Sequence, residues 1–263
     1  MVAARKLLRR AGRDRAGRFL VEGAQAVREA LATASVRDLA VHELFVTATA
    51  TDRHPELLAA ARAESVRISL VTDRVAETLS DTVTPQGLIA VCDLLDVPVR
   101  AALAGPPALV AVLVGVADPG NAGTVIRVAD AAGAGAVLLA GDTVDPHNAK
   151  AVRASTGSVF HLPLARDRDA AAVLAACRLA GLTLLAADGH GELDLHHPDM
   201  PAILAGPTAW VFGGEAHGLP PELAAAADHR VRVPIHGRAE SLNLATAAAV
   251  CLYASAQHRA REN

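Results

Sequence analysis

The sequence is poor in aromatic residues and has no long apolar run, and each shortage excludes a class of protein. Phe, Trp and Tyr make up 2% of the 263 residues against 52% hydrophobic residues, so an aliphatic core is expected. No apolar run approaches the roughly 20 residues that span a bilayer. The first ten residues, MVAARKLLRR, carry charges where a signal peptide is apolar. We therefore expect a cytoplasmic protein that does not enter a membrane.

Patterns for disulfides and metal sites are also missing. Cys92, Cys177 and Cys251 are far apart and form no CxxC pair. The histidines are scattered and show no HExxH or similar ligand spacing. We expect the cysteines to be small buried residues, and we predict no metal.

A net charge of −3 argues against a nucleic-acid partner, but the charge is unevenly distributed. One acidic residue, Asp14, stands among seven basic ones near the N-terminus: Arg5, Lys6, Arg9, Arg10, Arg13, Arg15 and Arg18. Such a stretch neutralises several phosphates if its side chains share a face. The alternative from charge alone is a solvated or disordered leader.

The hydrophobic pattern divides the chain into two parts. Residues 1–96 predict a small α/β domain, with helices over 22–31 and 54–64 and strands over 44–47, 66–71 and 87–92. Residues 97–107, VPVRAALAGPP, have the composition of a linker.

Residues 108–263 alternate nearly uninterrupted hydrophobic strands with helices, which indicates a parallel sheet covered on both faces. The predicted strands cover 109–116, 136–141, 182–187, 209–214 and 229–235. The predicted helices cover 121–133, 146–157, 168–180, 219–227 and 240–260.

Three segments of this second part place polar residues directly after a strand. Asn121 lies in a turn after the first strand, Glu215 follows Gly213 and Gly214, and Ser241 precedes the last helix. Ligands of open α/β sheets bind at the carboxyl ends of the strands, so these turns are predicted to face a site. The missing side chains of the two glycines would let a ligand approach. Taken singly, the glycines predict only a turn, and Ser241 predicts a helix N-cap.

Together the three segments resemble the motifs of the SpoU, or TrmH, branch of SPOUT RNA methyltransferases. The matching residues are Asn121 and Arg127 in the first motif, Phe212, Gly213, Glu215, Gly218 and Leu219 in the second, and Pro234, Gly237, Ser241, Leu242 and Asn243 in the third. Arg153, Ala154, Ser155 and Gly157 resemble a further family segment. Residues 19–23 (FLVEG) and 84–87 (TPQG) more weakly resemble the family's substrate-binding domain, which is similar to a ribosomal RNA-binding protein.

The resemblance implies a fold, a cofactor and an assembly. It implies an α/β protein whose parallel-sheet SPOUT domain carries a deep trefoil knot, an exception to the rule that chains avoid knots. It also implies a homodimer through the C-terminal domain and S-adenosylmethionine held largely by backbone. The residues that would border this cofactor are Leu139, Gly141, Gly213, Gly218, Val233, Ile235 and Leu242.

The implied reaction is methylation of a ribose 2′-hydroxyl in structured RNA, with ribosomal RNA preferred over transfer RNA. Arg127 would stabilise the forming alkoxide, since a guanidinium keeps its proton at neutral pH. Asn121, Ser241 and Asn243 would orient the substrate or Arg127, while Glu215 is either a proton acceptor or a structural tie. The predicted RNA contacts are Arg5, Lys6, Arg9, Arg10, Arg13, Lys150 and Arg153.

Two other functions compete with this interpretation. A dinucleotide-dependent dehydrogenase would need GxGxxG followed by an acidic residue about 20 positions later, and GNAGTVIR does not supply it. An RNA-binding protein that keeps the fold but lacks turnover is the alternative outside enzymes. The retention of Asn121, Arg127 and Glu215 argues against it.

Overall fold

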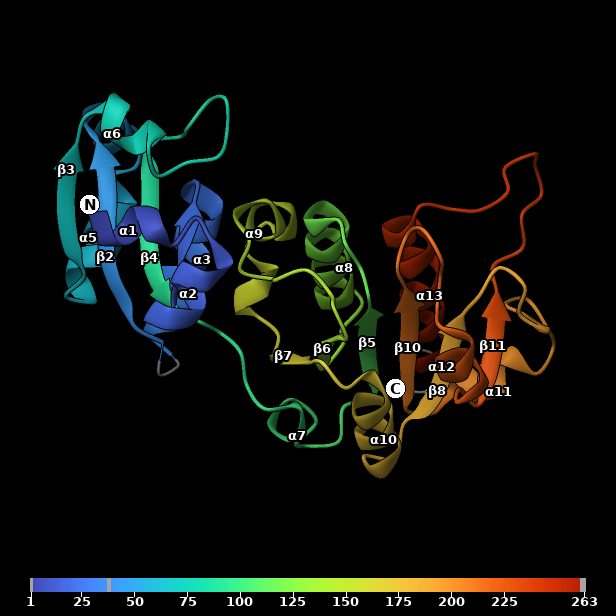
Figure 1. Cartoon of the computed structure of the whole chain (residues 1–263). Coiled ribbons are helices and arrows are strands. Elements are labelled where there is room, and N and C mark those ends of the chain that lie inside the picture. Colours follow the sequence, from blue (N-terminus) through green and yellow to red (C-terminus); the bar gives the residue numbers. More distant parts are fainter. Residues whose placement is uncertain (1, 37–38, 261–263) are drawn as a thin grey trace. The chain divides into compact units, whose positions relative to one another are not determined.

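The computed structural model describes residues 2–36 and 39–260, and their contacts form two compact units (Figure 1). The N-terminal unit holds Met1–Leu95 together with Asp145–His161. The C-terminal unit holds Asp96–Val144 and Leu162–Asn263.

The N-terminal unit is built on a mixed four-stranded sheet. Its strands lie in the order β1 (Arg18–Glu22), β4 (Leu88–Asp93), β2 (Val41–Thr47) and β3 (Arg67–Val71), with only β2 and β3 parallel. Its helices are α1 (Val2–Lys6), α2 (Arg10–Ala16), α3 (Ala24–Ala34), α4 (Ala48–Arg53), α5 (Pro55–Ala63), α6 (Asp73–Glu77), α9 (Ala149–Ser155) and the 3-10 turn η1 (Ser158–Phe160). The expected small α/β domain is confirmed, with β1 as a strand that the sequence pattern did not predict.

The basic N-terminal stretch is folded, so the interpretation as a disordered leader is wrong. Ala4 and Leu7 are buried and pack into a cluster with Phe45 and Ile89 of the sheet. Helix α1 and the residue that follows it therefore pack against the sheet, while most basic residues of α1 and α2 stay exposed.

Residues 145–161 lie between two strands of the other unit in sequence but pack with the N-terminal unit. The Phe160 ring stacks on Phe19 of β1 with centroids 6.1 Å apart. The guanidinium of Arg13 pairs with the buried carboxylate of Asp145 at 2.7 Å. This grouping differs from the sequence-based domain boundaries, because its partners lie more than a hundred residues away along the chain.

The C-terminal unit contains a seven-stranded sheet in which every pair is parallel, as predicted. The strand order is β7 (Leu164–Asp167), β6 (Ala136–Ala140), β5 (Leu109–Val114), β10 (Thr208–Gly213), β8 (Thr183–Ala187), β11 (His229–Arg232) and β9 (Leu193–Asp194). The helices are α7 (Val99–Ala102), α8 (Pro119–Ala131), α10 (Ala170–Leu179), α11 (Met200–Ala205), α12 (Pro221–Ala225) and α13 (Leu244–Ala260).

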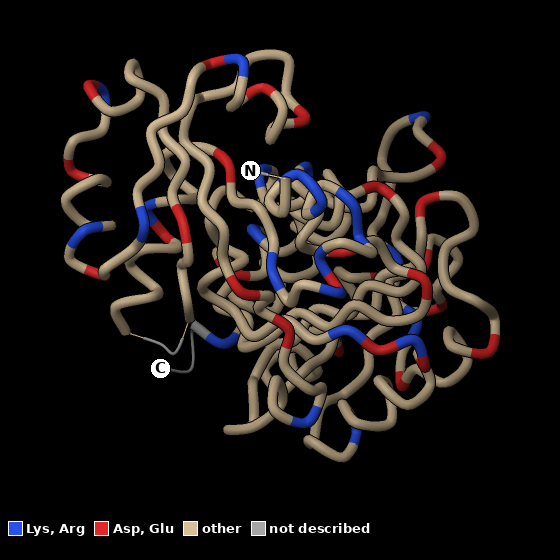
Figure 2. Tube along the Cα trace, turned by 60° about the vertical axis from the view of Figure 1, so that its left-hand side comes forward, with Lys and Arg blue, Asp and Glu red and all other residues tan. Residues whose placement is uncertain are grey.

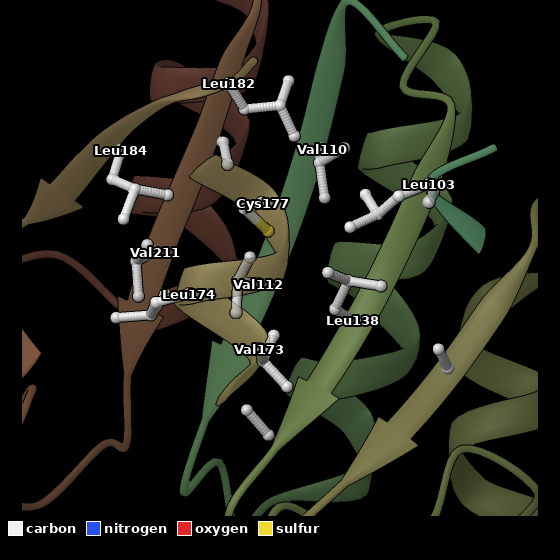
Figure 3. Packing of buried hydrophobic residues seen from close by; sticks show 14 of the residues in the cluster. Leu103, Val110, Val112, Leu138, Val173, Leu174, Cys177, Leu182, Leu184 and Val211 are labelled. Atoms are coloured by element: carbon white, nitrogen blue, oxygen red, sulfur yellow. The ribbon is translucent and has the colours of Figure 1, made fainter. Parts of the chain in front are cut away.

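Alternate residues of the central strands pack against helices on opposite faces of the sheet. Val110 and Val112 of β5 meet Leu174 and Cys177 of α10 in one aliphatic cluster (Figure 3). On the other face α13 packs against α8 and β10, and the indole of Trp210 donates to the Ser255 hydroxyl at 2.9 Å. The three cysteines are buried and free, as expected.

Several features of this unit differ from the prediction, among them β9 and α11, which the sequence pattern did not predict. Residues 97–107 do not form a free linker, because they contain α7 and bury Ala102 and Leu103 in the cluster of Figure 3. The edge strand β7 was missed because its sequence, LARD, ends in charged residues and lacks an apolar run. The threading that would make a knot stays a prediction.

Candidate active site

The predicted turns lie at the carboxyl ends of β5 and β10, which are neighbours in the sheet. From β5 the chain continues outward through β6 and β7, whereas β10 and β8 lie on its other side. The strand order therefore reverses between β5 and β10. A crevice outside the strand ends is expected at such a point and is the usual ligand site of open α/β sheets.

The turn after β5 begins helix α8. The Asp118 side chain accepts a hydrogen bond from the Asn121 backbone N–H at 2.8 Å, and Pro119 occupies the first helical position. An Asp-Pro pair is a strong helix start, because the carboxylate caps a free N–H and Pro needs none there. The helix thus begins two residues earlier than predicted and places Asn121 in its first turn.

The glycines after β10 are required by the packing of the chain on itself. A Cβ atom on Gly213 would lie 2.1 Å from the Gly218 carbonyl carbon, and one on Gly214 would lie 2.5 Å from the Gly115 oxygen. Gly218 N–H also donates to the Gly214 carbonyl at 2.9 Å, which closes the turn. The packing of the chain thus already requires these glycines, and the approach of a ligand to them stays a prediction.

Glu215, inside this closed turn, binds the turn after β5. Its carboxylate accepts hydrogen bonds from the Ala117 N–H at 3.0 Å, the Asp118 N–H at 3.1 Å and the Asn121 side-chain amide at 2.9 Å. Partial burial acts to raise the pKa of Glu215, but these hydrogen bonds outweigh it and hold the pKa below the ordinary value. The two backbone donors had no signal in the sequence.

Asn243 joins the third segment to the same network. Its side-chain amide donates to Asn121 Oδ1 at 3.1 Å, and its Oδ1 accepts from the Ala245 N–H at 2.9 Å at the start of α13. Asn243 is therefore the cap of this helix, and the alternative role of Ser241 as N-cap is wrong. Ser241 is exposed and lies two residues before the cap.

Arg127 and the loop before α13 complete this edge. Arg127 is exposed on α8, less than two turns after Asn121. Within the described residues, no backbone N–H from 233 to 242 donates a hydrogen bond to another part of the protein. The predicted cofactor residues Val233, Ile235 and Leu242 belong to this loop.

The remaining predicted cofactor residues lie at the ends of strands or in the turn. Leu139 is buried in β6, and Gly141 follows that strand with φ +66°. Gly213 ends β10, and Gly218 is exposed with φ +67°. A hollow of about 530 Å³ is lined by Glu192, Leu193 and Arg230, at the amino ends of β9 and β11. It therefore lies at the amino ends of the strands, opposite to the carboxyl ends that carry the turns described above.

The predicted RNA-binding residues have different environments. Arg5, Lys6, Arg9, Arg10 and Lys150 are exposed, and the basic residues near the N-terminus gather in Figure 2. Arg13 is only 3% exposed and is held by Asp145 and by the Leu7 carbonyl at 2.9 Å, so its assignment to RNA is wrong. Arg153 pairs with Asp81 and lies 3.6 Å from Glu22, which leaves little free positive charge for a phosphate.

The motifs, sheet and turns agree with known proteins. The model of the "SpoU rRNA Methylase family" matches residues 108–253, more than half of the chain. The chain belongs to the SpoU rRNA methylase family. A second family model, "MRM3-like substrate binding domain", matches residues 3–90, so the predicted likeness of the N-terminal part to a substrate-binding domain is confirmed.

Members of this family resemble the chain over nearly its full length. The 23S rRNA (uridine(2479)-2'-O)-methyltransferase of Streptomyces viridochromogenes is 34% identical, over 94% of this chain and 85% of its own. The 23S rRNA (guanosine(2553)-2'-O)-methyltransferase of Bacillus subtilis is 31% identical, over 95% of this chain and 92% of its own. The AdoMet-bound rRNA methyltransferase from Sinorhizobium meliloti superposes with a TM-score of 0.82 at 31% identity, over 98% of this chain and 94% of its own.

No group of three or more His, Cys, Asp or Glu side chains in residues 2–36 and 39–260 is arranged to hold a metal ion. No helix in the same ranges combines the length and apolar character needed to cross a bilayer.

We predict that Glu215→Gln weakens the C-terminal unit, because an amide places a donor against the donors of Ala117, Asp118 or Asn121. The expected loss is roughly 1–2 kcal/mol at neutral pH, measured by denaturant unfolding followed through the single tryptophan, Trp210. Because the folded pKa is lowered, the stabilisation is present above the ordinary value of 4.5 and is lost as the pH falls through the folded value.

The difference between the two proteins should therefore be constant from about pH 5 to 8 and shrink in more acid solution. Glu222→Gln, at the start of α12, is the control and should show no comparable loss. Equal stability of wild type and Glu215→Gln at neutral pH would contradict the structural role.

Proposed function

We propose that this protein transfers the methyl group of S-adenosylmethionine to a ribose 2′-hydroxyl of ribosomal RNA. The observation that carries the proposal is the hydrogen-bonded path from Asn243 through Asn121 to Glu215, which joins three loops at the switch point of the sheet. Relatives of similar length are named as methyltransferases of 23S rRNA. One is named for uridine and the other for guanosine, so family membership does not identify the methylated base.

The residues at this edge fit the proposed cofactor. The loop over 233–242 offers backbone N–H and carbonyl groups that no hydrogen bond within the described residues occupies. Such groups need polar partners, and an adenosine moiety supplies donors and acceptors. Residues 139 and 141 at the end of β6, and 213 and 218 around the second turn, would border the same ligand. When bound, S-adenosylmethionine supplies an electrophilic methyl group on a sulfonium sulfur.

The protein's own contribution is mainly to position the reacting groups. The reaction needs the 2′-oxygen to lie in line with the methyl group that the cofactor would supply, and it needs the 2′-hydroxyl to lose its proton. Alignment of two bound reactants lowers the barrier by several kcal/mol, since it makes the encounter intramolecular. The network of Asn121, Asn243 and Glu215 holds the three loops in place for this alignment.

The side chains differ in their ability to help the proton leave. Glu215 is a weak base because its pKa is lowered and its oxygens already accept three hydrogen bonds. Arg127 stays protonated and is suited to stabilise the developing alkoxide or an adjacent phosphate. We therefore assign the proton to an RNA phosphate or to water, and Glu215 to positioning. We assign Ser241, which is exposed and has no capping role, to contact with the substrate.

We also propose a homodimer that forms through α13 of the C-terminal unit. Val250 and Tyr253 of this helix are 37% and 46% exposed, although both are large and apolar. The helix begins at Asn243, so a partner on this face would lie beside the reacting loops. A cytoplasmic location agrees with action on ribosomal RNA and stays part of the proposal.

We predict that Arg127→Ala abolishes methyl transfer and leaves cofactor affinity within about twofold, because the guanidinium is assigned to RNA. Calorimetry with S-adenosylmethionine measures the affinity, and tritium transfer into deproteinised ribosomal RNA measures turnover. Arg168→Ala, an exposed arginine outside the motifs, is the control. A large loss of cofactor affinity in a folded Arg127→Ala protein would refute the assignment, and wild-type binding without transfer would favour a silent RNA-binding protein.

We predict that the triple substitution Arg5→Ala, Lys6→Ala and Arg9→Ala weakens RNA binding and flattens its dependence on salt. If all three residues contact phosphates, the slope of log affinity against log salt should fall by about 2 to 3 units. Filter binding at several salt concentrations checks this. A matched triple of exposed arginines, Arg53→Ala, Arg62→Ala and Arg74→Ala, should change the slope less. An equal change of slope in both proteins would contradict specific phosphate contacts by the N-terminal residues, because it would show only a general effect of charge.

We predict that Tyr253→Glu together with Val250→Glu converts a dimer into a monomer, since two carboxylates per chain would have to be desolvated in the interface. Light scattering should give twice the chain mass for the wild type and the single mass for the variant. Leu179→Glu, on α10 and 91% exposed, is the control. A monomeric wild type, or a dimer that survives both substitutions, would rule out this interface.

A further inference from the structure

A polar cavity in the N-terminal unit is separate from the loops described above. It has a volume of about 210 Å³ and lies between the end of β1, the start of α3, the loop before β4 and the end of α9. Its polar side chains are those of Glu22, Gln25, Thr82, Thr84, Gln86, Arg153 and Thr156. Pockets that hold whole drug-sized ligands are about 300–1,000 Å³, so this cavity suits a smaller planar or compact group.

The charges around the cavity disfavour a phosphate. Arg153 is the cation of the lining, and it is paired with Asp81 and lies 3.6 Å from the buried carboxylate of Glu22. Two carboxylates therefore offset one guanidinium. An anionic ligand would gain little from Arg153 and would be repelled by Glu22, whereas a neutral ligand meets no such cost.

The remaining polar groups can make neutral hydrogen bonds. Glu22 is occupied, since its oxygens accept from Ser80 at 2.8 Å and from Thr82 at 3.1 Å. Gln86 uses its side-chain oxygen to accept from the Ala24 N–H at 3.2 Å. Its amide nitrogen and the Thr84 hydroxyl form no hydrogen bond with any residue in the described ranges. The cavity thus offers a free donor and a free hydroxyl that can donate or accept.

Val83, between two residues of the lining, is fully exposed to solvent, with a relative accessibility of 103%. The exposed apolar side chain would suit the face of a nucleobase. The neutral donors and acceptors beside it would suit the edge. Proteins recognise specific RNA largely through splayed, unpaired bases that are hydrogen-bonded along their edges. The lining has no aromatic side chain, so hydrogen bonds and aliphatic contact would hold the base instead of stacking.

We propose that this cavity binds one unpaired nucleobase of the RNA substrate. The proposal rests on the proposed function, because it takes RNA as the ligand. The loops assigned to methyl transfer belong to the C-terminal unit, so we assign the cavity to a nucleotide other than the methylated one. It acts as a specificity site, whereas the exposed N-terminal cations contact phosphates without regard to sequence.

Kinetics with Thr84→Val and Gln86→Ala test the proposal on the full chain. The substrate is total ribosomal RNA from cells that lack the gene. Each variant should raise the KM for RNA about 3- to 10-fold and leave kcat within about twofold, since one neutral hydrogen bond to the RNA is lost. Thr78→Val is the matched control, because it removes an exposed hydroxyl of the same unit outside the cavity.

Unchanged KM values for both variants, or an equal rise in Thr78→Val, would overturn the proposal that the cavity binds a nucleobase. If the wild type transfers no methyl group, the proposed function fails instead. A gel shift with the same RNA then still tests the cavity, with the same expected loss of affinity for the two variants.

Crosslinking gives a second readout that a purely structural role would not produce. The photoreactive residue benzoylphenylalanine replaces Val83 in one protein and Val36, 78% exposed in the same unit, in the control. The label at 83 should crosslink to one or a few unpaired nucleotides of the ribosomal RNA, mapped as stops of reverse transcription. A pattern at 83 that is absent, or as dispersed as that at 36, would contradict the proposal.

Discussion

The arrangement of the reacting edge depends on the carboxylate of Glu215. It accepts hydrogen bonds from two backbone N–H groups of the turn after β5 and from the Asn121 amide, and Asn121 in turn accepts from Asn243. Three segments that lie up to 122 residues apart in the sequence are thereby joined around one charged acceptor. Charge-assisted hydrogen bonds are about twice as strong as neutral ones, so a carboxylate is well suited to this position.

This constraint explains why the glycines next to Glu215 have a packing role. Gly213 lies against the Gly218–Leu219 backbone and Gly214 against the Gly115 carbonyl, at distances that no Cβ atom could occupy. The two turns can approach each other only because these side chains are missing. The approach brings Glu215 within reach of Ala117 and Asp118, and the switch point of the sheet supplies the crevice in which a ligand would bind.

The basic residues at the start of the N-terminal unit have two different environments. Seven basic residues lie between positions 5 and 18, but the structure buries Arg13 with Asp145 and leaves Arg5, Lys6, Arg9 and Arg10 exposed. Burial of a lone guanidinium would be costly, and Asp145 and the Leu7 carbonyl offset that cost. The same cluster shifts the pKa of the Asp145 carboxylate. Burial acts to raise this pKa, but His147 and Arg13 lower it by more than burial raises it.

Much of the fold followed from local patterns. Hydrophobic runs predicted β5, β6, β8 and β10, because a parallel strand buried on both faces needs apolar side chains at nearly every position. The order and spacing of Asn121, Arg127, Glu215, Ser241 and Asn243 were enough to indicate the family and the edge of the sheet that carries the reaction. These features are encoded within short windows, so they are visible in the sequence alone.

The tertiary structure decided which partner each polar side chain has. Nothing near Arg13 in the sequence indicates that it binds Asp145, and nothing near Arg153 indicates Asp81. The role of Glu215 as a tie and the contact of Asn243 with Asn121 likewise depend on groups that only folding brings within 3.1 Å of them. The sequence by itself determined most of the strands, the family and the chemistry of the site, because those depend on residue type and local order. Only the packed chain decided which charges are free for RNA, because that depends on which distant groups desolvate and pair them.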